Sequence, residues 1–354
     1  MTRSKLAIVL FNLGGPDRPE AIKPFLINLF TDPAILRVPF FVRPILARII
    51  AYARVKPATA NYEILGGKSP LLELTQDQAR ALELAMPEHD VRCFIAMRYW
   101  HPMSDAAARE VRDWNPDQVI LLPLYPQYST TTTGSSFTAW REAAARAGLI
   151  KPTTTLCCYH SDPGFVAATA AMLRWAYDDA RAKLDPAIPL RILFSAHGLP
   201  ETIIERGDPY QSQMEETVAA VVKQLDIPGL DHAICYQSRA TPQKWIGPST
   251  EEELERAVHD ETAVLISPIA FVSEHSETLV ELDVEYRELA EKAGIKGYFR
   301  APAQNSDPGF IAALADLVRT SLARGPGLCS FAGGRTCASK HRDCPHARAG
   351  TAAP

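Results

Sequence analysis

A histidine and a group of acidic residues follow two apolar runs in the second half of the chain. His197 directly follows the run at 190–196, and the acidic group follows the run at 263–267. Such runs predict buried strands of a parallel sheet, whose ends are where ligands bind. Because imidazole and carboxylate groups bind divalent first-row metals and accept protons, the sequence predicts a metal-handling site there. The acidic group comprises Glu274, His275, Glu277, Glu281 and Glu285.

The spacing within this group predicts a helix that begins near Ser276. In an α-helix, the three glutamates at 277, 281 and 285 would lie on one face, with Glu274 and His275 just before the first turn. A solvated acidic face has the same spacing, so spacing alone leaves both interpretations open. The presence of His197 at a neighbouring strand end favours the metal site.

Three cysteines lie close to the C-terminus, at positions 329, 337 and 344, within a glycine-containing segment. We expect this segment, residues 326–354, to be a flexible tail that is too polar to fold by burial. Three thiolates require a fourth ligand, and Cys158 or Cys157 is the candidate for a four-cysteine iron–sulfur cluster. A structural zinc site that uses His341 or His346 and a disordered tail are the alternatives.

The remaining pattern predicts an α/β protein built from two similar Rossmann-like domains, each with a four-stranded parallel sheet flanked by helices. Residues 161–168 recur in nearly the same form at 306–313, which supports two related halves. We expect halves at 1–155 and 156–305, followed by a terminal helix at 306–325 that packs back on the first half. The predicted strands are 6–10, 91–97, 118–124, 154–159, 190–196, 232–236, 263–267 and 296–300.

Composition narrows the function classes. The 354 residues carry a net charge of −4 without a long basic run, which argues against a nucleic-acid partner. No secretion signal is evident, so we expect a cytoplasmic protein. No stretch is long and apolar enough to span a bilayer, but the apolar lip at 34–55 is interspersed with arginines. This lip is either a peripheral membrane contact or a buried helix or lid.

Polar residues also follow the predicted strands of the first half. The segment 125–136 offers hydroxyl groups at a helix N-terminus, which suits an anionic group. Neither the dinucleotide glycine pattern nor the P-loop lysine pattern follows any strand, which disfavours a nucleotide enzyme.

Four motifs of this chain, in their order and at their separations, resemble those of the ferrochelatases. The resemblance runs from about Lys5 to Arg324 and implies a chelatase fold with a porphyrin in the cleft between the two halves. It implies insertion of Fe²⁺ into protoporphyrin IX to form protohaem, the terminal step of haem biosynthesis. The motifs are the turn at 12–16, residues 124–129 with 132–136, residues 195–197, and residues 273–275 with 277–279.

The resemblance also implies roles for single residues. His197 would accept pyrrole protons or bind iron, with Glu277 as its partner at the metal, and Glu274, His275 and Glu281 would relay protons or iron. Glu274 stands where the family often has aspartate. The residues implied to line the porphyrin pocket are Leu13, Arg98, Tyr99, Tyr128, Ser129 and Trp245.

Some ferrochelatases bind a two-iron two-sulfur cluster, and the cysteines of this chain are similar to those ligands. The implied set is Cys158, Cys329, Cys337 and Cys344. The C-terminal spacing is wider than in the animal enzymes, and Thr130 stands where those enzymes place their internal cysteine.

Three alternatives to protohaem synthesis stay open on the residues alone. They are a coproporphyrin ferrochelatase, a chelatase for another divalent metal, and a non-catalytic tetrapyrrole or metal carrier. Both a monomer and a homodimer are compatible with the sequence.

Overall fold

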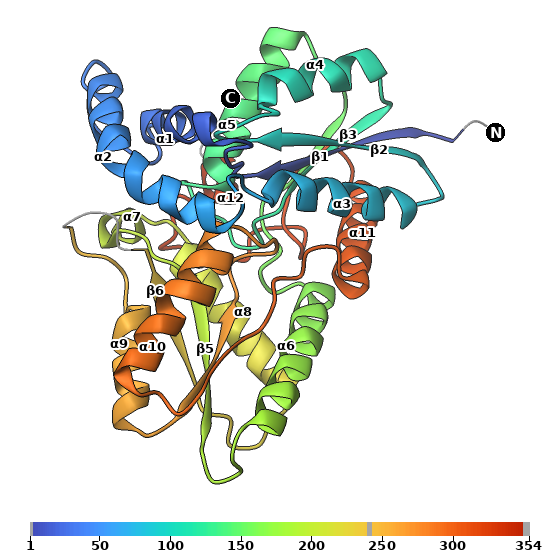
Figure 1. The fold of residues 1–354 in the computed structure, drawn as a ribbon. Coiled ribbons are helices and arrows are strands. Elements are labelled where there is room, and N and C mark those ends of the chain that lie inside the picture. The colour runs from blue at the N-terminus through green and yellow to red at the C-terminus, as the bar shows by residue number, and fades with distance from the viewer. Residues whose placement is uncertain (1–2, 239–242, 350–354) are drawn as a thin grey trace. The chain divides into compact units, whose positions relative to one another are not determined.

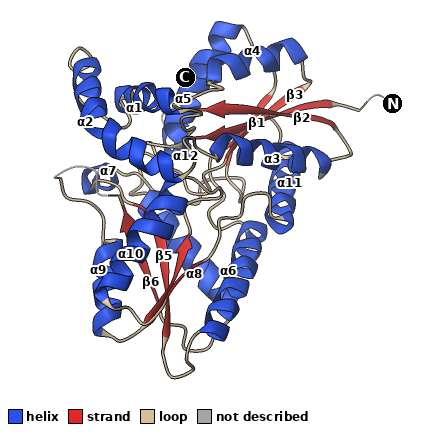
Figure 2. Cartoon of the chain, in the orientation of Figure 1, coloured by secondary structure: helices blue, strands red, loops and turns tan. Residues whose placement is uncertain are grey.

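The computed structural model describes residues 3–238 and 243–349, so the first two residues of the first predicted half and the last five of the predicted tail lie outside it. The chain divides into two compact units (Figures 1 and 2). The first unit is Met1–Cys158 with Leu314–Arg335, and the second is Tyr159–Ala313 with Thr336–Pro354.

The first unit is built on a parallel sheet in the order β2-β1-β3-β4-β9. Strand β1 is buried along both faces, as expected for a central parallel strand. One face of the sheet packs against α4 and α5, where Phe11 meets Phe137 and Trp140 edge to face. The strands are β1 Lys5–Asn12, β2 Asp90–Met97, β3 Gln118–Pro123, β4 Thr153–Leu156 and β9 Gly327–Cys329.

The helices of this unit connect the strands and cover the sheet. The last part of α11, Pro308–Ala323, also belongs to it, and there Arg319 pairs with Glu88 at 2.7 Å. The others are η1 Pro19–Ala21, α1 Ile22–Thr31, α2 Arg43–Ile64, α3 Leu71–Leu84, α4 Ser104–Trp114 and α5 Thr133–Ala147.

The second unit has a parallel sheet in the order β6-β5-β7-β8, with α9, α10 and the helix η2 packed on one face. Its strands are β5 Leu190–His197, β6 His232–Gln237, β7 Ala263–Pro268 and β8 Tyr298–Arg300. Its helices are α6 Pro163–Lys183, α7 Glu201–Glu205, α8 Tyr210–Leu225, α9 Thr250–His259, η2 Glu277–Glu285, α10 Tyr286–Ala293 and α12 Pro345–Ala349.

The repeated motif forms two identical helix starts that meet each other. Asp162 and Asp307 each accept a hydrogen bond of 3.0 Å from the backbone N–H of the phenylalanine three residues on, at the starts of α6 and α11. A Cβ on Gly164 would lie 3.0 Å from Ala313 Cβ. Glycine at this position therefore allows the two helix starts to approach closely.

The predicted α/β class with parallel sheets and covering helices is confirmed, and each predicted strand is present. Two expectations were wrong. The first sheet has five strands instead of four, because β9 pairs with β4 and places Cys329 beside Leu156. The tail is therefore not merely flexible and polar: Cys329 and Cys344 are both buried.

The acidic helix also differs from the prediction. Residues Glu277–Glu285 form a π-helix, with i→i+5 hydrogen bonds, instead of an α-helix. Glu277 and Glu281 still share a neighbour, Gln237, while Glu285 is exposed. The expected single acidic face is thus reduced to two residues.

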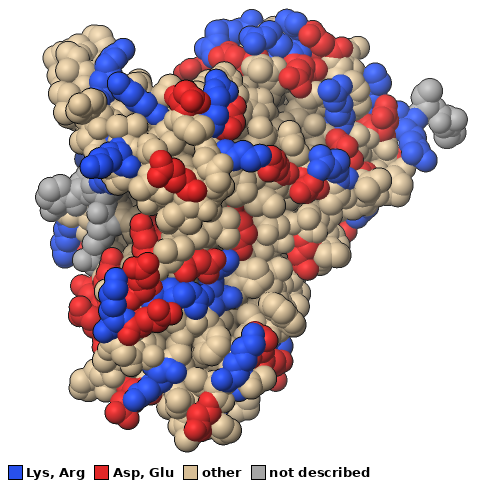
Figure 3. All heavy atoms as spheres, in the orientation of Figure 1, with Lys and Arg blue, Asp and Glu red and all other residues tan. Residues whose placement is uncertain are grey.

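The apolar lip of the first unit presents large side chains to solvent. Phe40, Ile45 and Tyr52 are 79%, 62% and 73% exposed, whereas Ala47 and Ala51 form the buried side of α2. No described helix is both long and apolar enough to cross a membrane. Acidic and basic side chains alternate over the face shown in Figure 3.

Candidate active site

His197 and Glu277 meet at the carboxyl edge of the second sheet. His197 is the last residue of β5, and Glu277 begins η2, in the segment that follows β7. Strands β5 and β7 are neighbours in parallel register, so their ends bring these two residues together. His197 Nδ1 lies 3.3 Å from Glu277 Oε2, an ion-pair contact rather than a well-aligned hydrogen bond.

The charges of this pair favour a protonated imidazole. Burial by itself lowers the pKa of His197, but the nearby carboxylates of Glu277 and Glu281 outweigh it and raise that pKa above its usual value. Burial acts in the opposite direction on Glu277, whose pKa is nevertheless held well below its usual range by His197 and His275. The pair can therefore take up a proton as imidazolium beside a stable carboxylate.

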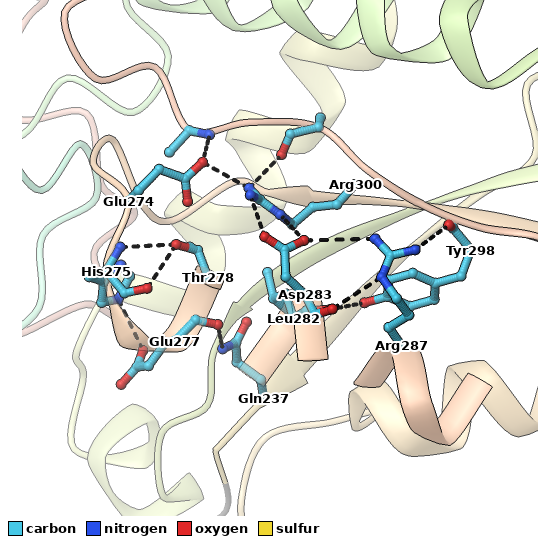
Figure 4. A network of polar contacts seen from close by, with 12 residues as sticks. Gln237, Glu274, His275, Glu277, Thr278, Leu282, Asp283, Arg287, Tyr298 and Arg300 are labelled. Carbon is cyan, nitrogen blue, oxygen red and sulfur yellow. Dashed lines mark hydrogen bonds and ion pairs between the residues drawn. The ribbon is translucent and has the colours of Figure 1, made fainter. Parts of the chain in front are cut away.

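His275 contacts the same carboxylate oxygen of Glu277 as His197 does. Its Nε2 lies 3.5 Å from Glu277 Oε2, and its Nδ1 is 3.1 Å from the carbonyl oxygen of Ser273. Its backbone N–H donates to Thr278 Oγ1 at 3.0 Å (Figure 4). The centroid of its ring lies 4.5 Å from that of Phe271. Two imidazoles thus contact one carboxylate oxygen.

Glu281 lies one turn further along η2, in a different environment. Gln237 Nε2 and Ser238 Oγ donate to its carboxylate at 3.0 and 2.7 Å. Burial and the negative charge of Glu277 raise the pKa of Glu281 to about 7. Tyr286 Oη lies within 3.3 Å of Glu281 and 3.2 Å of the exposed Glu251. Glu281 can therefore exchange a proton near neutral pH.

Glu274 is held in a separate network (Figure 4). Its Oε1 accepts hydrogen bonds from Arg300 Nη1 at 2.9 Å and from the backbone N–H of Ala303 at 2.8 Å. Arg300 also binds Asp283 in bidentate fashion at 2.6 and 2.7 Å. Although burial opposes it, Arg300 holds the pKa of Glu274 below its usual value, so Glu274 is ionised.

In the first unit, Arg98 and Tyr99 are held by a buried aspartate. Arg98 Nη2 lies 2.7 Å from Asp32 Oδ2, and Tyr99 Oη donates to the same oxygen at 2.8 Å. Ser135 Oγ donates to this carboxylate as well. The backbone N–H of Tyr99 donates to the carbonyl of Leu13 at 2.9 Å, so the ends of β1 and β2 are joined here.

The other predicted pocket residues lie near these strand ends or near His197. Tyr128 and Ser129 are buried in the segment after β3. Trp245 belongs to the second unit, where a Cβ on Gly198 would lie 3.3 Å from Trp245 Cε3. The glycine that follows His197 thus allows the indole to approach that strand end.

Comparison with known proteins shows the family. The ferrochelatase profile matches residues 5–322. The chain is 53% identical to the ferrochelatase of Caulobacter vibrioides (strain NA1000 / CB15N), over 96% of this chain and 97% of that protein. It is 49% identical to the ferrochelatase of Phenylobacterium zucineum (strain HLK1), over 95% and 98%. The chain belongs to the ferrochelatase family.

Solved structures support the fold. SirB from Bacillus subtilis with Fe³⁺ superposes with a TM-score of 0.51 at 13% identity, over 91% of this chain and 96% of that chain. The sirohydrochlorin chelatase SirB from Bacillus subtilis subspecies spizizenii in complex with cobalt gives the same TM-score at 12% identity, over 90% and 96%. As a ferrochelatase, the chain is a metal-inserting lyase that takes Fe²⁺ and a porphyrin as substrates.

The predicted cluster cysteines of this ferrochelatase fall in both units. In the first, the backbone N–H of Cys157 donates to the carbonyl of Cys329 at 2.8 Å, and Cys158 follows directly. In the second, Cys337 Sγ accepts from Gln213 Nε2 at 3.2 Å, and Cys344 is buried. Within the described ranges, no set of three or more His, Cys, Asp or Glu residues is arranged as a metal site.

Several residues of the ferrochelatase site were not predicted from sequence. Gln237, Ser238 and Arg300 stand at or just after the ends of β6 and β8, so the strand-end rule applied to every strand would have found them. Asp32 and Asp283 carry no such signal, because each lies in a helix or just after one and is recognisable only by its arginine partner.

Proposed function

We propose that this ferrochelatase inserts Fe²⁺ into protoporphyrin IX to form protohaem, with His197 and Glu277 at the point of metal insertion. The observation that carries the proposal is the 3.3 Å contact between His197 Nδ1 and Glu277 Oε2 at the end of the second sheet. Metal insertion must remove two pyrrole protons and deliver a divalent cation to the ring nitrogens. A basic imidazole beside an ionised carboxylate offers a group for each task.

The proposed proton path begins at His197. Because Glu277 raises the pKa of His197, the neutral imidazole is the stronger base toward a pyrrole proton, and the carboxylate stabilises the resulting imidazolium. Glu281, with a pKa of about 7, can take a proton and release it at neutral pH. Tyr286 and the exposed Glu251 extend this path toward solvent. His275 serves the same carboxylate as a second imidazole.

Glu274 is the less direct member of the proposed relay. One of its oxygens is occupied by Arg300 and Ala303, and the other, Oε2, is buried and accepts no hydrogen bond from any described residue. That second oxygen is the atom through which Glu274 would act.

For porphyrin binding, we retain the residues that the family resemblance implies. Arg98 supplies a cation, and Tyr99 supports it from a buried position beside Asp32. Because Asp32 fixes both side chains, the guanidinium is already oriented before an anionic porphyrin substituent arrives. The other residues that the resemblance implies for porphyrin binding are Leu13, Tyr128, Ser129 and Trp245.

The iron–sulfur cluster is a further proposal, with Cys158, Cys329, Cys337 and Cys344 as ligands. It is supported by strand β9, which brings Cys329 beside the 157–158 pair, and by the burial of Cys344. Four thiolates are the usual ligands of such a cluster. We expect anaerobically purified protein to show visible charge-transfer bands that Cys329→Ser abolishes and Cys93→Ser preserves. Colourless protein with one bound zinc would identify the zinc alternative.

A peripheral membrane contact by the apolar lip is proposed from its exposed side chains. The exposed apolar residues of α2 and the segment before it alternate with arginines, which suits an anionic lipid surface. We expect wild-type protein to float with vesicles of phosphatidylserine and phosphatidylcholine, and Ile45→Glu to reduce that flotation. Leu84→Glu, at an 83% exposed apolar residue of α3, is the matched control. Absence of wild-type flotation would exclude the contact.

The central test is an anaerobic assay of purified protein with Fe²⁺ and protoporphyrin IX. We expect porphyrin fluorescence to fall as a haem spectrum rises. Coproporphyrin III and Co²⁺ are tested in parallel, and faster turnover of either would show that it is the preferred substrate. Tight porphyrin binding without turnover of any porphyrin–metal pair would favour a non-catalytic carrier.

A further inference from the structure

Residues 336–349, which we call the clasp, lie against the loop between α7 and α8 in the second unit. The backbone N–H of Asp343 donates to the carbonyl of Gly207 at 3.1 Å. A Cβ built on Gly207 would lie 2.6 Å from the backbone nitrogen of Arg342, and Gly207 has a φ of +105°. Only glycine suits this conformation and this close approach. The clasp therefore contacts the loop through its backbone, at a position shaped for it.

The clasp also reaches helix α8. Gln213 Nε2, on that helix, donates to Cys337 Sγ at 3.2 Å. The His341 imidazole is buried. The clasp therefore contacts both α8 and the loop before it.

That same element fixes His197. Asp208, which is fully buried, accepts a hydrogen bond of 3.0 Å from the backbone N–H of Tyr210, the first residue of α8. The buried Tyr210 hydroxyl then donates to the backbone carbonyl of His197 at 3.0 Å. Only two residues separate Gly207, held by the clasp, from Tyr210, held on His197.

We propose that Tyr210 is a positioning residue for His197, and that the clasp sets the position of Tyr210 through Gly207. The inference rests on the proposed function, since it concerns how the imidazole of that site is oriented. His197 ends its strand, and its carbonyl is bound from α8 while its ring faces Glu277. Loss of the Tyr210 hydroxyl, or of the clasp contact, would leave the His197 backbone carbonyl without this hydrogen bond or with a displaced donor, and the orientation of the imidazole would change.

The first test is Tyr210→Phe, which removes only the hydroxyl. Loss of one neutral hydrogen bond predicts a fall in kcat of about fivefold. The KM for protoporphyrin should stay within about twofold, because the variant keeps the ring that fills the space. In protein labelled with ¹⁵N-histidine, the His197 imidazole signals should shift while those of the exposed His259 stay in place. Unchanged kcat and unchanged His197 signals would overturn the role of Tyr210.

The second test separates the clasp from its side chains. Asp343→Pro removes the N–H that donates to Gly207, whereas Asp343→Ala keeps it and loses only the carboxylate that pairs with Arg348. We expect the proline variant to lower kcat about as much as Tyr210→Phe, and the alanine variant to match wild type. In the Tyr210→Phe background, Asp343→Pro should have little further effect, since both changes act through one contact.

Additive effects in the double variant would overturn the coupling, because the clasp would then act by another route. A visible spectrum of each variant is recorded because Cys344 is next to residue 343, and a fall in kcat of Asp343→Pro that occurs only with loss of cluster bands would overturn the coupling. An inactive wild-type protein would instead contradict the proposed function, which separates the two failures.

Discussion

Replacing His197 by alanine is the sharpest perturbation of the proposed site. His197 faces Glu277 at 3.3 Å, and the carboxylate raises its pKa, so the imidazole is the described group best placed to accept a pyrrole proton. A positioned general base contributes about 10²- to 10⁴-fold to a rate. We therefore expect His197→Ala to lower kcat by that factor, equivalent to about 3 to 5 kcal/mol of barrier.

The assay is anaerobic haem formation, read alongside porphyrin binding by fluorescence quenching. Binding should stay near the wild-type value, because the residues implied to hold the macrocycle are unchanged. Glu277 keeps His275 at 3.5 Å in the variant, so we expect the fold to persist in thermal unfolding. His259→Ala, at an exposed histidine of α9, is the control and should leave turnover intact. Turnover of His197→Ala close to the wild-type value would refute the assignment of the base.

Three further predictions follow from charges in the second unit. Glu277→Gln removes the main group that raises the pKa of His197, so the acid limb of the kcat profile should move to lower pH, and an unmoved limb would contradict the pairing. The pKa of Glu281 is raised from 4.5 to about 7 in the folded protein, so ionisation of this group lowers the free energy of unfolding as the pH rises between these two values. In urea unfolding, the free energy of unfolding of Glu281→Gln should therefore fall less over this pH range than that of wild type, and an equal fall would contradict the raised pKa. Arg300→Met leaves the buried carboxylate of Glu274 without its cation and should lower the free energy of unfolding, measured with urea, by about 3 to 5 kcal/mol. Arg300→Lys should have an intermediate effect, and an unchanged urea midpoint in Arg300→Met would contradict the role of the network.

The strands were predictable because each is an apolar run bounded by polar or turn residues. Strand β1, for example, is buried from Leu6 to Phe11. Strand β9 was not, since Gly327–Cys329 is only three residues long and begins with glycine. Strand β9 forms because the edge of β4 offers backbone hydrogen-bonding groups with which residues 327–329 can pair. This pairing depends on the tertiary structure and leaves no signal in the local sequence.

The site was predictable where it follows the topology of parallel sheets. His197 and Glu277 were expected together because both follow strands whose carboxyl ends share an edge. The π-helix was not expected, because glutamates four apart fit an α-helix equally well and the i→i+5 pattern depends on packing. Nor could sequence show that Arg300 would bind Glu274, since the two are 26 positions apart and approach only when β8 lies beside β7.

The two glutamates of η2 show how one helix can serve two chemical tasks. Glu277 and Glu281 are the same residue type one turn apart, yet the pKa of the first is held well below its usual range while that of the second rises to about 7. The difference arises from neighbours: two imidazoles face Glu277, whereas Glu281 has the amide of Gln237, the hydroxyl of Ser238 and the charge of Glu277 itself. An ionised carboxylate suits a divalent cation, and one that titrates near neutrality suits a proton in transit. Paired groups whose pKa values are driven apart in this way are a physical indication of acid–base function. This split supports the proposed roles, in which Glu277 faces the metal and Glu281 transfers protons.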